Sequence, residues 1–260
     1  MAEDTILVKR DGFIATVILN RPEKLNALTK CMWARLGEVM RQLSADDDTR
    51  CIVVRGAGDR SFAPGNDISE FENERNNLEK AETYGEIIHQ TLDAFRECRH
   101  PTVALINGIC VGGGLEIAGL CDIRICGESS RFGVPINRLG LVMGYAEIEA
   151  LIELVGRSTA LEILLEGRVF GAAEAKDKGL VTRIVKDGEV GAEAYETARR
   201  IAVGAPLVAR WHKKFTRRLR EPAPLSDEER REGYACYATQ DFQEGYHAFL
   251  EKRIPEFKGR

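Results

Sequence analysis

The segment Asn107-Gly-Ile-Cys-Val-Gly-Gly-Gly-Leu-Glu-Ile-Ala-Gly-Leu120 carries one carboxylate, Glu116, in an apolar stretch that opens on three glycines. Glycines 112 to 114 have no side chains, so their backbone N–H groups can approach a ligand closely. The residues that follow predict a short helix, whose N-terminal amides stabilise negative charge. A buried carboxylate needs a partner or acquires a raised pKa. The pattern indicates oxyanion donors beside an acid/base group. A plain strand-to-helix turn is an equally weighted alternative.

A second segment, Ser61-Phe-Ala-Pro-Gly-Asn-Asp-Ile68, follows the apolar run Cys51–Arg55, which predicts a buried strand. Gly65 and Asn66 both tolerate unusual backbone angles. This loop is therefore a candidate source of another N–H group aimed into a pocket, although such a segment alone is more often only a loop.

Together these segments resemble the crotonase superfamily, also called the enoyl-CoA hydratase/isomerase family. The resemblance covers nearly the whole chain. It implies an α/β fold built as a spiral of strand–strand–helix repeats with a C-terminal helical region. We expect residues 1–190 to form the core with the acyl-CoA site and residues 191–260 to serve packing and oligomerisation. The motifs that carry the resemblance are Asn20–Leu28, Phe62–Asp67, Asn107–Glu116, Cys121–Arg124, Phe132–Pro135 and Phe242–Arg253.

The resemblance also implies a reaction type. The family binds acyl-CoA thioesters and polarises the carbonyl with two backbone N–H groups, which here correspond to Asn66 and Gly113. Glu116 corresponds to the family's first catalytic glutamate. No metal and no cofactor are expected apart from the coenzyme A of the substrate. The expected substrate and CoA contacts are Lys24, Leu25, Ala63, Pro64, Gly65, Asp67, Ile68, Gly112, Ile136 and Tyr145.

The chain departs from the family pattern at the second glutamate of the hydratases, where it has Ile136. Hydration needs water activation and carbon protonation, which a carboxylate pair performs, so two-glutamate hydration is in doubt. Glu147 is the first candidate for a replacement, ahead of Glu149. Alternatively, both are solvated charges on a helix.

Three functions stay open. Lyase or isomerase chemistry on an acyl-CoA leads because Glu116 and both donor segments are intact. A malonyl-type acyl-CoA decarboxylase needs the oxyanion donors without the second glutamate. A catalytically silent acyl-CoA-binding scaffold is the alternative from another class, and Ile136 is its main support. The acyl group, its length and the pathway are not readable from the sequence.

Composition is typical of a globular enzyme, with 44% hydrophobic and 30% charged residues in 260. A net charge of −4 gives no indication of a nucleic-acid or anionic-membrane surface. Seven scattered cysteines without a CxxC pair predict reduced thiols. An acidic N-terminus and the absence of a long apolar run favour the cytoplasm. The resemblance implies a homotrimer or a homohexamer formed by two trimers.

Periodicity predicts alternating strands and helices. A helix capped by Thr29 extends to about Leu43, and another runs from about Ala81 to Cys98. The basic run 210–220 predicts an amphipathic helix with a solvated charged face, although a CoA phosphate could neutralise part of it. Ser226 is expected to begin a further helix. The predicted strands are Ile6–Lys9, Phe13–Leu19, Cys51–Arg55, Thr102–Ile106, Cys121–Cys126 and Val181–Val185.

Overall fold

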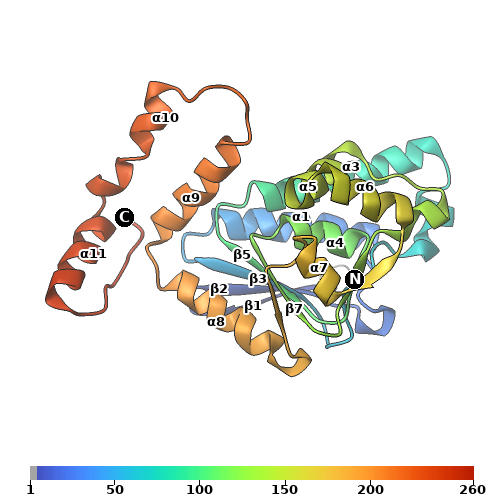
Figure 1. The fold of residues 1–260 in the computed structure, drawn as a ribbon, viewed down its shortest axis with the longest axis horizontal. Coiled ribbons are helices and arrows are strands. Elements are labelled where there is room, and N and C mark those ends of the chain that lie inside the picture. The colour runs from blue at the N-terminus through green and yellow to red at the C-terminus, as the bar shows by residue number, and fades with distance from the viewer. Residues whose placement is uncertain (1–4) are drawn as a thin grey trace.

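The computed structural model describes residues 5–260, in which helices pack around two β-sheets (Figure 1). The larger sheet has the strand order β1-β2-β3-β5-β7-β10, antiparallel between β1 and β2 and parallel elsewhere. Its strands are β1 (Ile6–Asp11), β2 (Ile14–Leu19), β3 (Cys51–Gly56), β5 (Thr102–Ile106), β7 (Ile123–Gly127) and β10 (Arg183–Val185).

The central strands are buried on both faces because helices cover each side of the sheet. In β3 and β5, Val53 and Val103 point into one cluster of buried side chains, whereas Val54 and Ala104 point into the other. Such strands are continuous apolar runs, as expected for a parallel sheet with both faces covered. Helix α8 (Val190–Ala202) covers the first face.

Helices on the opposite face form the main core and carry the candidate site. Thr29 caps α1 by accepting a hydrogen bond from the Met32 amide at 3.2 Å, which confirms the predicted helix start. The side chain of Trp33 is fully buried in this core. The helices on this side of the sheet are α1 (Lys30–Ala45), α3 (Leu78–Arg96), α4 (Gly113–Leu120), α5 (Tyr145–Val155) and α6 (Arg157–Glu166).

A second sheet of very short strands, in the order β4-β6-β8-β9, was missed by the sequence analysis. Three residues are too few to show a two-residue alternation above background. This sheet positions the site, because α4 begins two residues after β6 ends. Its strands are β4 (Ser61–Ala63), β6 (Ile109–Val111), β8 (Arg131–Gly133) and β9 (Val169–Gly171), and α7 (Ala172–Asp177) follows β9.

Several predicted boundaries were wrong. Helix α3 starts at Leu78, three residues before the predicted Ala81, because the Asn77 side chain accepts a hydrogen bond from the Lys80 amide. The preceding polar stretch contains a short helix, α2 (Phe71–Glu74). The strand predicted from Cys121 begins at Ile123, and the one predicted from Val181 begins at Arg183.

The basic run lies on α9 (Pro206–Arg218) and the two residues after it, and only part of it is the predicted solvated face, on which Lys214, Arg217 and Arg220 are exposed. Arg210 and Lys213 have side chains that are only 14% and 18% exposed, and both pair with carboxylates of the main body. Lys213 Nζ also donates to the carbonyl of His100 at 2.8 Å. These cations dock the helix on the core.

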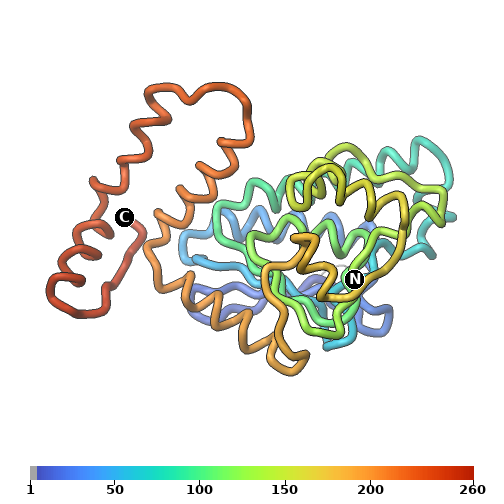
Figure 2. Tube along the Cα trace, viewed as in Figure 1, coloured from blue at the N-terminus to red at the C-terminus, as the bar shows by residue number. Residues whose placement is uncertain are grey.

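The last helices extend away from the main body as an arm, which Figures 1 and 2 show in orange and red. The arm consists of α10 (Asp227–Glu232) and α11 (Gln240–Glu251), and Ser226 begins it with a capping box, as predicted. Phe249, Leu250 and Ile254 are 71–87% exposed on this arm. The predicted domain boundary near residue 190 stays a prediction. Within residues 5–260, no helix combines the length and hydrophobicity needed to cross a bilayer.

Substituting two helical glycines tests the close contact between α4 and β4. A Cβ on Gly114 would overlap the Ala63 carbonyl, whereas a Cβ on Gly85 in α3 meets nothing within 4 Å. Gly114→Ala should lower the free energy of unfolding by roughly 2 kcal/mol or more, because backbone has to move. Gly85→Ala should raise it by up to about 1 kcal/mol, because alanine favours helix. Urea unfolding measures both, and a Gly114→Ala protein as stable as the parent would contradict the packing.

Candidate active site

Glu116 lies in the first turn of α4, where its amide donates a hydrogen bond to the Gly112 carbonyl at 3.0 Å. The chain turns sharply from β6 into this helix because Gly112 has φ of +52°, a conformation that glycine adopts readily. The turn directs the Glu116 side chain into the space between α3, α4 and α5. The helix thus presents a carboxyl group where the surrounding side chains are almost all apolar.

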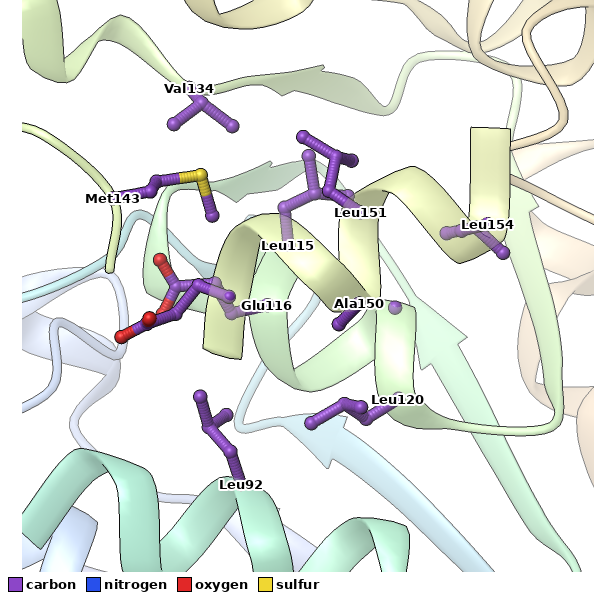
Figure 3. Close-up of a pocket in the computed structure, with 11 residues that line it drawn as sticks. Leu92, Leu115, Glu116, Leu120, Val134, Met143, Ala150, Leu151 and Leu154 are labelled. Atoms are coloured by element: carbon purple, nitrogen blue, oxygen red, sulfur yellow. The ribbon is translucent and has the colours of Figure 1, made fainter. Parts of the chain in front are cut away.

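A small cavity with apolar walls surrounds the Glu116 carboxyl group, and Figure 3 shows leucine side chains and Met143 around it. The volume open to a water-sized sphere is about 20 Å³, which is enough for one water molecule. Apart from Glu116 and Glu147, no ionisable side chain lines it within the described part of the chain. The complete lining is Leu92, Leu115, Glu116, Gly119, Leu120, Val134, Met143, Glu147, Ala150, Leu151 and Leu154.

This environment raises the pKa of Glu116 to about 8. Burial is the larger cause because an apolar cavity solvates the charged form poorly. The negative charge of Glu147 raises the pKa further, and the cation of Arg75 opposes both effects. At neutral pH Glu116 is therefore mainly protonated and set up to donate a proton.

Glu147 approaches the same cavity from the first turn of α5. Its side chain is only 10% exposed, and its Oε1 lies 3.5 Å from Nε2 of His89 on α3. Its Oε2 is buried and has no hydrogen-bond partner within residues 5–260. Glu149, by contrast, is exposed. The interpretation of both glutamates as solvated helix charges is therefore wrong for Glu147.

The amide of Asn66 is free because the loop after β4 pairs with Leu28 through its neighbours. The Leu28 amide donates to the Gly65 carbonyl at 2.9 Å, and the Asp67 amide donates to the Leu28 carbonyl at 2.8 Å. In such a parallel bridge the residue between them points its own N–H to the other side. Within residues 5–260, the Asn66 N–H has no hydrogen-bond acceptor.

The second amide, that of Gly113, belongs to the first residue of α4 and has no intrahelical acceptor. Gly65, with φ of +107°, brings the other loop against it, because a Cβ on Gly65 would lie 3.3 Å from the Gly113 nitrogen. Two unpaired amides, those of Asn66 and Gly113, are thus held close together, and Gly113 lies three residues before Glu116 along the chain. This arrangement suits the binding of a negatively charged oxygen.

The side chain of Asn66 has a structural partner that the sequence analysis missed. The indole N–H of the fully buried Trp33 donates to Asn66 Oδ1 at 2.6 Å. The same indole ring packs against Gly113, where an added Cβ would lie 2.9 Å from it. Trp33 therefore contacts both candidate donor segments. The aromatic residue's position in an amphipathic helix predicted core packing but could not show this contact.

Arg21 and Asn26, which were also missed, hold the segment 20–28 against the segment 61–67. Arg21 Nη1 donates to the Ala27 carbonyl at 2.8 Å and pairs with Asp67 Oδ2 at 3.0 Å. Asn26, buried with φ of +65°, donates to the Ser61 carbonyl at 2.8 Å. The pKa of Asp67 is lowered first by its hydrogen bond from Ser69 and then by Arg21. Asp67 thus has structural partners in addition to its expected CoA contact.

The other expected substrate contacts are spread over several environments. Leu25 and Pro64 are partly buried, Ala63 and Gly112 are buried, and Lys24 and Ile68 are exposed. Tyr145 is 95% exposed and lies outside the cavity lining. Ile136, in the short 3₁₀ turn Pro135–Leu139, packs against the main core and likewise does not line the cavity. Their roles in substrate binding stay predictions.

No set of three or more potential ligand side chains within residues 5–260 is arranged for a metal ion. All seven cysteines are free thiols, and burial raises the pKa of Cys121 to about 12. A buried thiol with a raised pKa, such as that of Cys121, is a poor nucleophile and ligand, because the reactive form is the thiolate.

Comparison with known proteins agrees with this geometry. The sequence profile of the enoyl-CoA hydratase/isomerase family matches residues 9–260. The chain belongs to this family. It is 32% identical to a short-chain-enoyl-CoA hydratase of Clostridium acetobutylicum over the full length of both chains. A crystal structure of an enoyl-CoA hydratase/carnithine racemase from Magnetospirillum magneticum superimposes with a TM-score of 0.97 at 48% identity, covering 99% of this chain and 97% of the other.

The enoyl-CoA hydratase of Bacillus anthracis also matches, with a TM-score of 0.92 and 30% identity over 98% of this chain and all of the other. The crotonase fold expected from the sequence is thereby confirmed. The second carboxyl group in the cavity lining, that of Glu147, comes from α5, whereas Ile136 lies in the 3₁₀ turn Pro135–Leu139 and does not line the cavity.

Asn66→Ala tests whether the donor at this position is the backbone. The variant keeps the amide but leaves the buried Trp33 N–H unpaired, so the free energy of unfolding should fall by about 1–3 kcal/mol. Turnover of an acyl-CoA substrate should stay within about tenfold of the parent, because a lost oxyanion donor would cost roughly 100-fold or more. A folded Asn66→Ala protein with turnover reduced 100-fold would assign the chemistry to the side chain.

The raised pKa of Glu116 predicts how stability depends on pH. Between pH 4.5 and about 8, Glu116 carries a proton in the folded protein but not in the unfolded chain. Its contribution to the free energy of unfolding is therefore complete below pH 4.5 and is lost as the pH rises to about 8. Glu116→Gln should remove this decline and stabilise the protein by roughly 2–4 kcal/mol at pH 9 relative to the parent. Glu149→Gln, on an exposed side chain, is the matched control. The free energy of unfolding is measured for both proteins from pH 5 to 9. A constant difference between the parent and Glu116→Gln over this range would contradict the raised pKa.

Proposed function

We propose that the protein catalyses lyase or isomerase chemistry on acyl-CoA thioesters through an enolate, with Glu116 as the acid and Glu147 as the base. Family membership supports the acyl-CoA substrate. The observation that carries the proposal is that Glu116, whose pKa burial raises to about 8, shares one apolar cavity with a second carboxyl group, that of Glu147. Environments that hold one carboxyl group protonated beside an ionised one are the arrangement that general acid/base pairs require.

Hydration of a 2-enoyl thioester is the leading reaction. Water attacks C3 while Glu147 accepts its proton, and the C2–C3 π electrons move onto the thioester oxygen to form the enolate. The amides of Asn66 and Gly113 hold this oxyanion. Glu116 then gives its proton to C2, and a proton passed from Glu147 to Glu116 restores the starting state. A cavity with room for one water molecule supports this assignment.

Glu147 thus takes the role that Ile136 cannot perform. The relocated carboxylate argues against both a decarboxylase and a silent scaffold, since neither requires a second buried carboxylate. Isomerisation remains compatible with the same pair, because either reaction passes through the same enolate. Assembly as a trimer or hexamer stays a prediction, which the exposed apolar side chains of α11 support. The cytoplasmic location also stays a prediction.

Two substitutions and a control test the pair. Glu116→Gln and Glu147→Gln should each lower turnover of crotonyl-CoA by roughly 100-fold or more, because each removes one proton-transfer group. Glu149→Gln should leave turnover within about twofold. The readout is the loss of absorbance of the conjugated thioester, with 3-enoyl-CoA isomerisation and CO₂ release from malonyl-CoA measured in parallel. Turnover of malonyl-CoA alone would assign a decarboxylase, and no turnover of any thioester that binds would assign a scaffold.

A further inference from the structure

His89 lies next to the carboxylate of Glu147. The proposed mechanism relies on this carboxylate, although it belongs to none of the family motifs. His89 lies on α3, and its Nε2 is 3.5 Å from Glu147 Oε1. The imidazole is 43% exposed while the Glu147 side chain is 10% exposed, so His89 stands between solvent and the enclosed carboxylate. It does not line the cavity and so does not reach the reacting atoms.

The electrostatic surroundings of Glu147 leave this role to His89. Glu116 on α4 adds no positive charge, and Arg75 acts on Glu116 while packing 4.8–4.9 Å from the rings of Phe71 and Tyr84. Arg96 on α3 pairs with Asp93 and donates to the Ala146 carbonyl at 2.5 Å.

The other two acids of α5, Glu149 and Glu153, are both exposed. Within residues 5–260, His89 is therefore the side chain at ion-pair distance from Glu147. A carboxylate with one buried oxygen lacking a hydrogen bond needs such a partner, because an unpaired buried charge is costly.

We propose that His89 is a positioning residue that holds the Glu147 carboxylate beside Glu116, where it acts as the base. This inference rests on the proposed acid and base assignments. An imidazole next to a carboxylate in an apolar cavity fixes the position of that carboxylate and reduces the cost of enclosing it.

Without the imidazole, the Glu147 carboxylate is no longer held beside Glu116 and acts less effectively as a base. Its negative charge then raises the pKa of Glu116 less, so Glu116 loses its proton at a lower pH. The expected signature is a fall in kcat together with a changed pH profile. KM should be little affected, because α3 contributes no residue to the expected CoA contacts.

The experiment compares His89→Phe with His89→Gln. Phenylalanine has a similar volume and no polar atom, so kcat for crotonyl-CoA at pH 7 should fall by roughly 10- to 100-fold, with KM within about threefold. The alkaline limb of the kcat profile should move to lower pH. Glutamine keeps a hydrogen-bond donor but lacks the imidazole. On a logarithmic scale of kcat, His89→Gln should recover at least a third of the loss seen in His89→Phe. His212→Gln, on the exposed surface of α9, controls for the loss of a histidine and should behave like the parent.

A double variant separates this inference from the proposed function. In a Glu147→Gln background, His89→Phe should cause no further loss, because the group it positions is gone. Losses that multiply, or a His89→Phe protein with the parent's kcat and pH profile, would overturn the inference while leaving the acid and base assignment intact. A parent protein that turns over no thioester would overturn the proposed function and the inference with it. Circular dichroism and urea unfolding verify that each variant is folded.

Discussion

The close approach of two backbone segments, Gly65 on one loop and Gly112–Gly113 on the other, is the constraint on which the site depends. Side chains at these positions would hold the loops apart, since a Cβ on Gly65 already lies 3.3 Å from the Gly113 nitrogen. The contact leaves two amides without acceptors in the described chain and starts α4 where Glu116 enters the cavity. The surrounding structure maintains this close approach. Trp33 contacts both segments, and Arg21 ties the first loop to the neighbouring segment 20–28.

The family, the main sheet and the candidate donor residues could be predicted because they are written in local sequence. Apolar runs such as Cys51–Arg55 become doubly buried strands, and Thr29 and Ser226 cap helices through hydrogen bonds to residues three positions away. The Gly-rich segment likewise encodes its own turn. Each of these features is determined within a few residues, so reading the chain in order is sufficient.

What the sequence could not show depends on contacts between distant segments. Glu147 has the local pattern of an ordinary first-turn helix charge, and only the packing of α3, α4 and α5 makes it a buried neighbour of Glu116. Trp33 and Asn66 are 33 positions apart, and the charges of α9 look solvated until their partners on the core are known. Short strands of three residues carry too little pattern to be recognised. Only the folded structure shows that the cavity has a second carboxyl group, that of Glu147 from α5, while Ile136 lies outside its lining.

We propose that the backbone amides of Asn66 and Gly113 polarise the thioester carbonyl. Infrared difference spectroscopy of crotonyl-CoA with a ¹³C-labelled thioester carbonyl, bound to the Glu116→Gln protein, tests this directly because slow turnover preserves the complex. The carbonyl stretch should lie at lower frequency in the complex than in water, as expected when two donors point at the oxygen. A stretch at the same or a higher frequency than in water would contradict it.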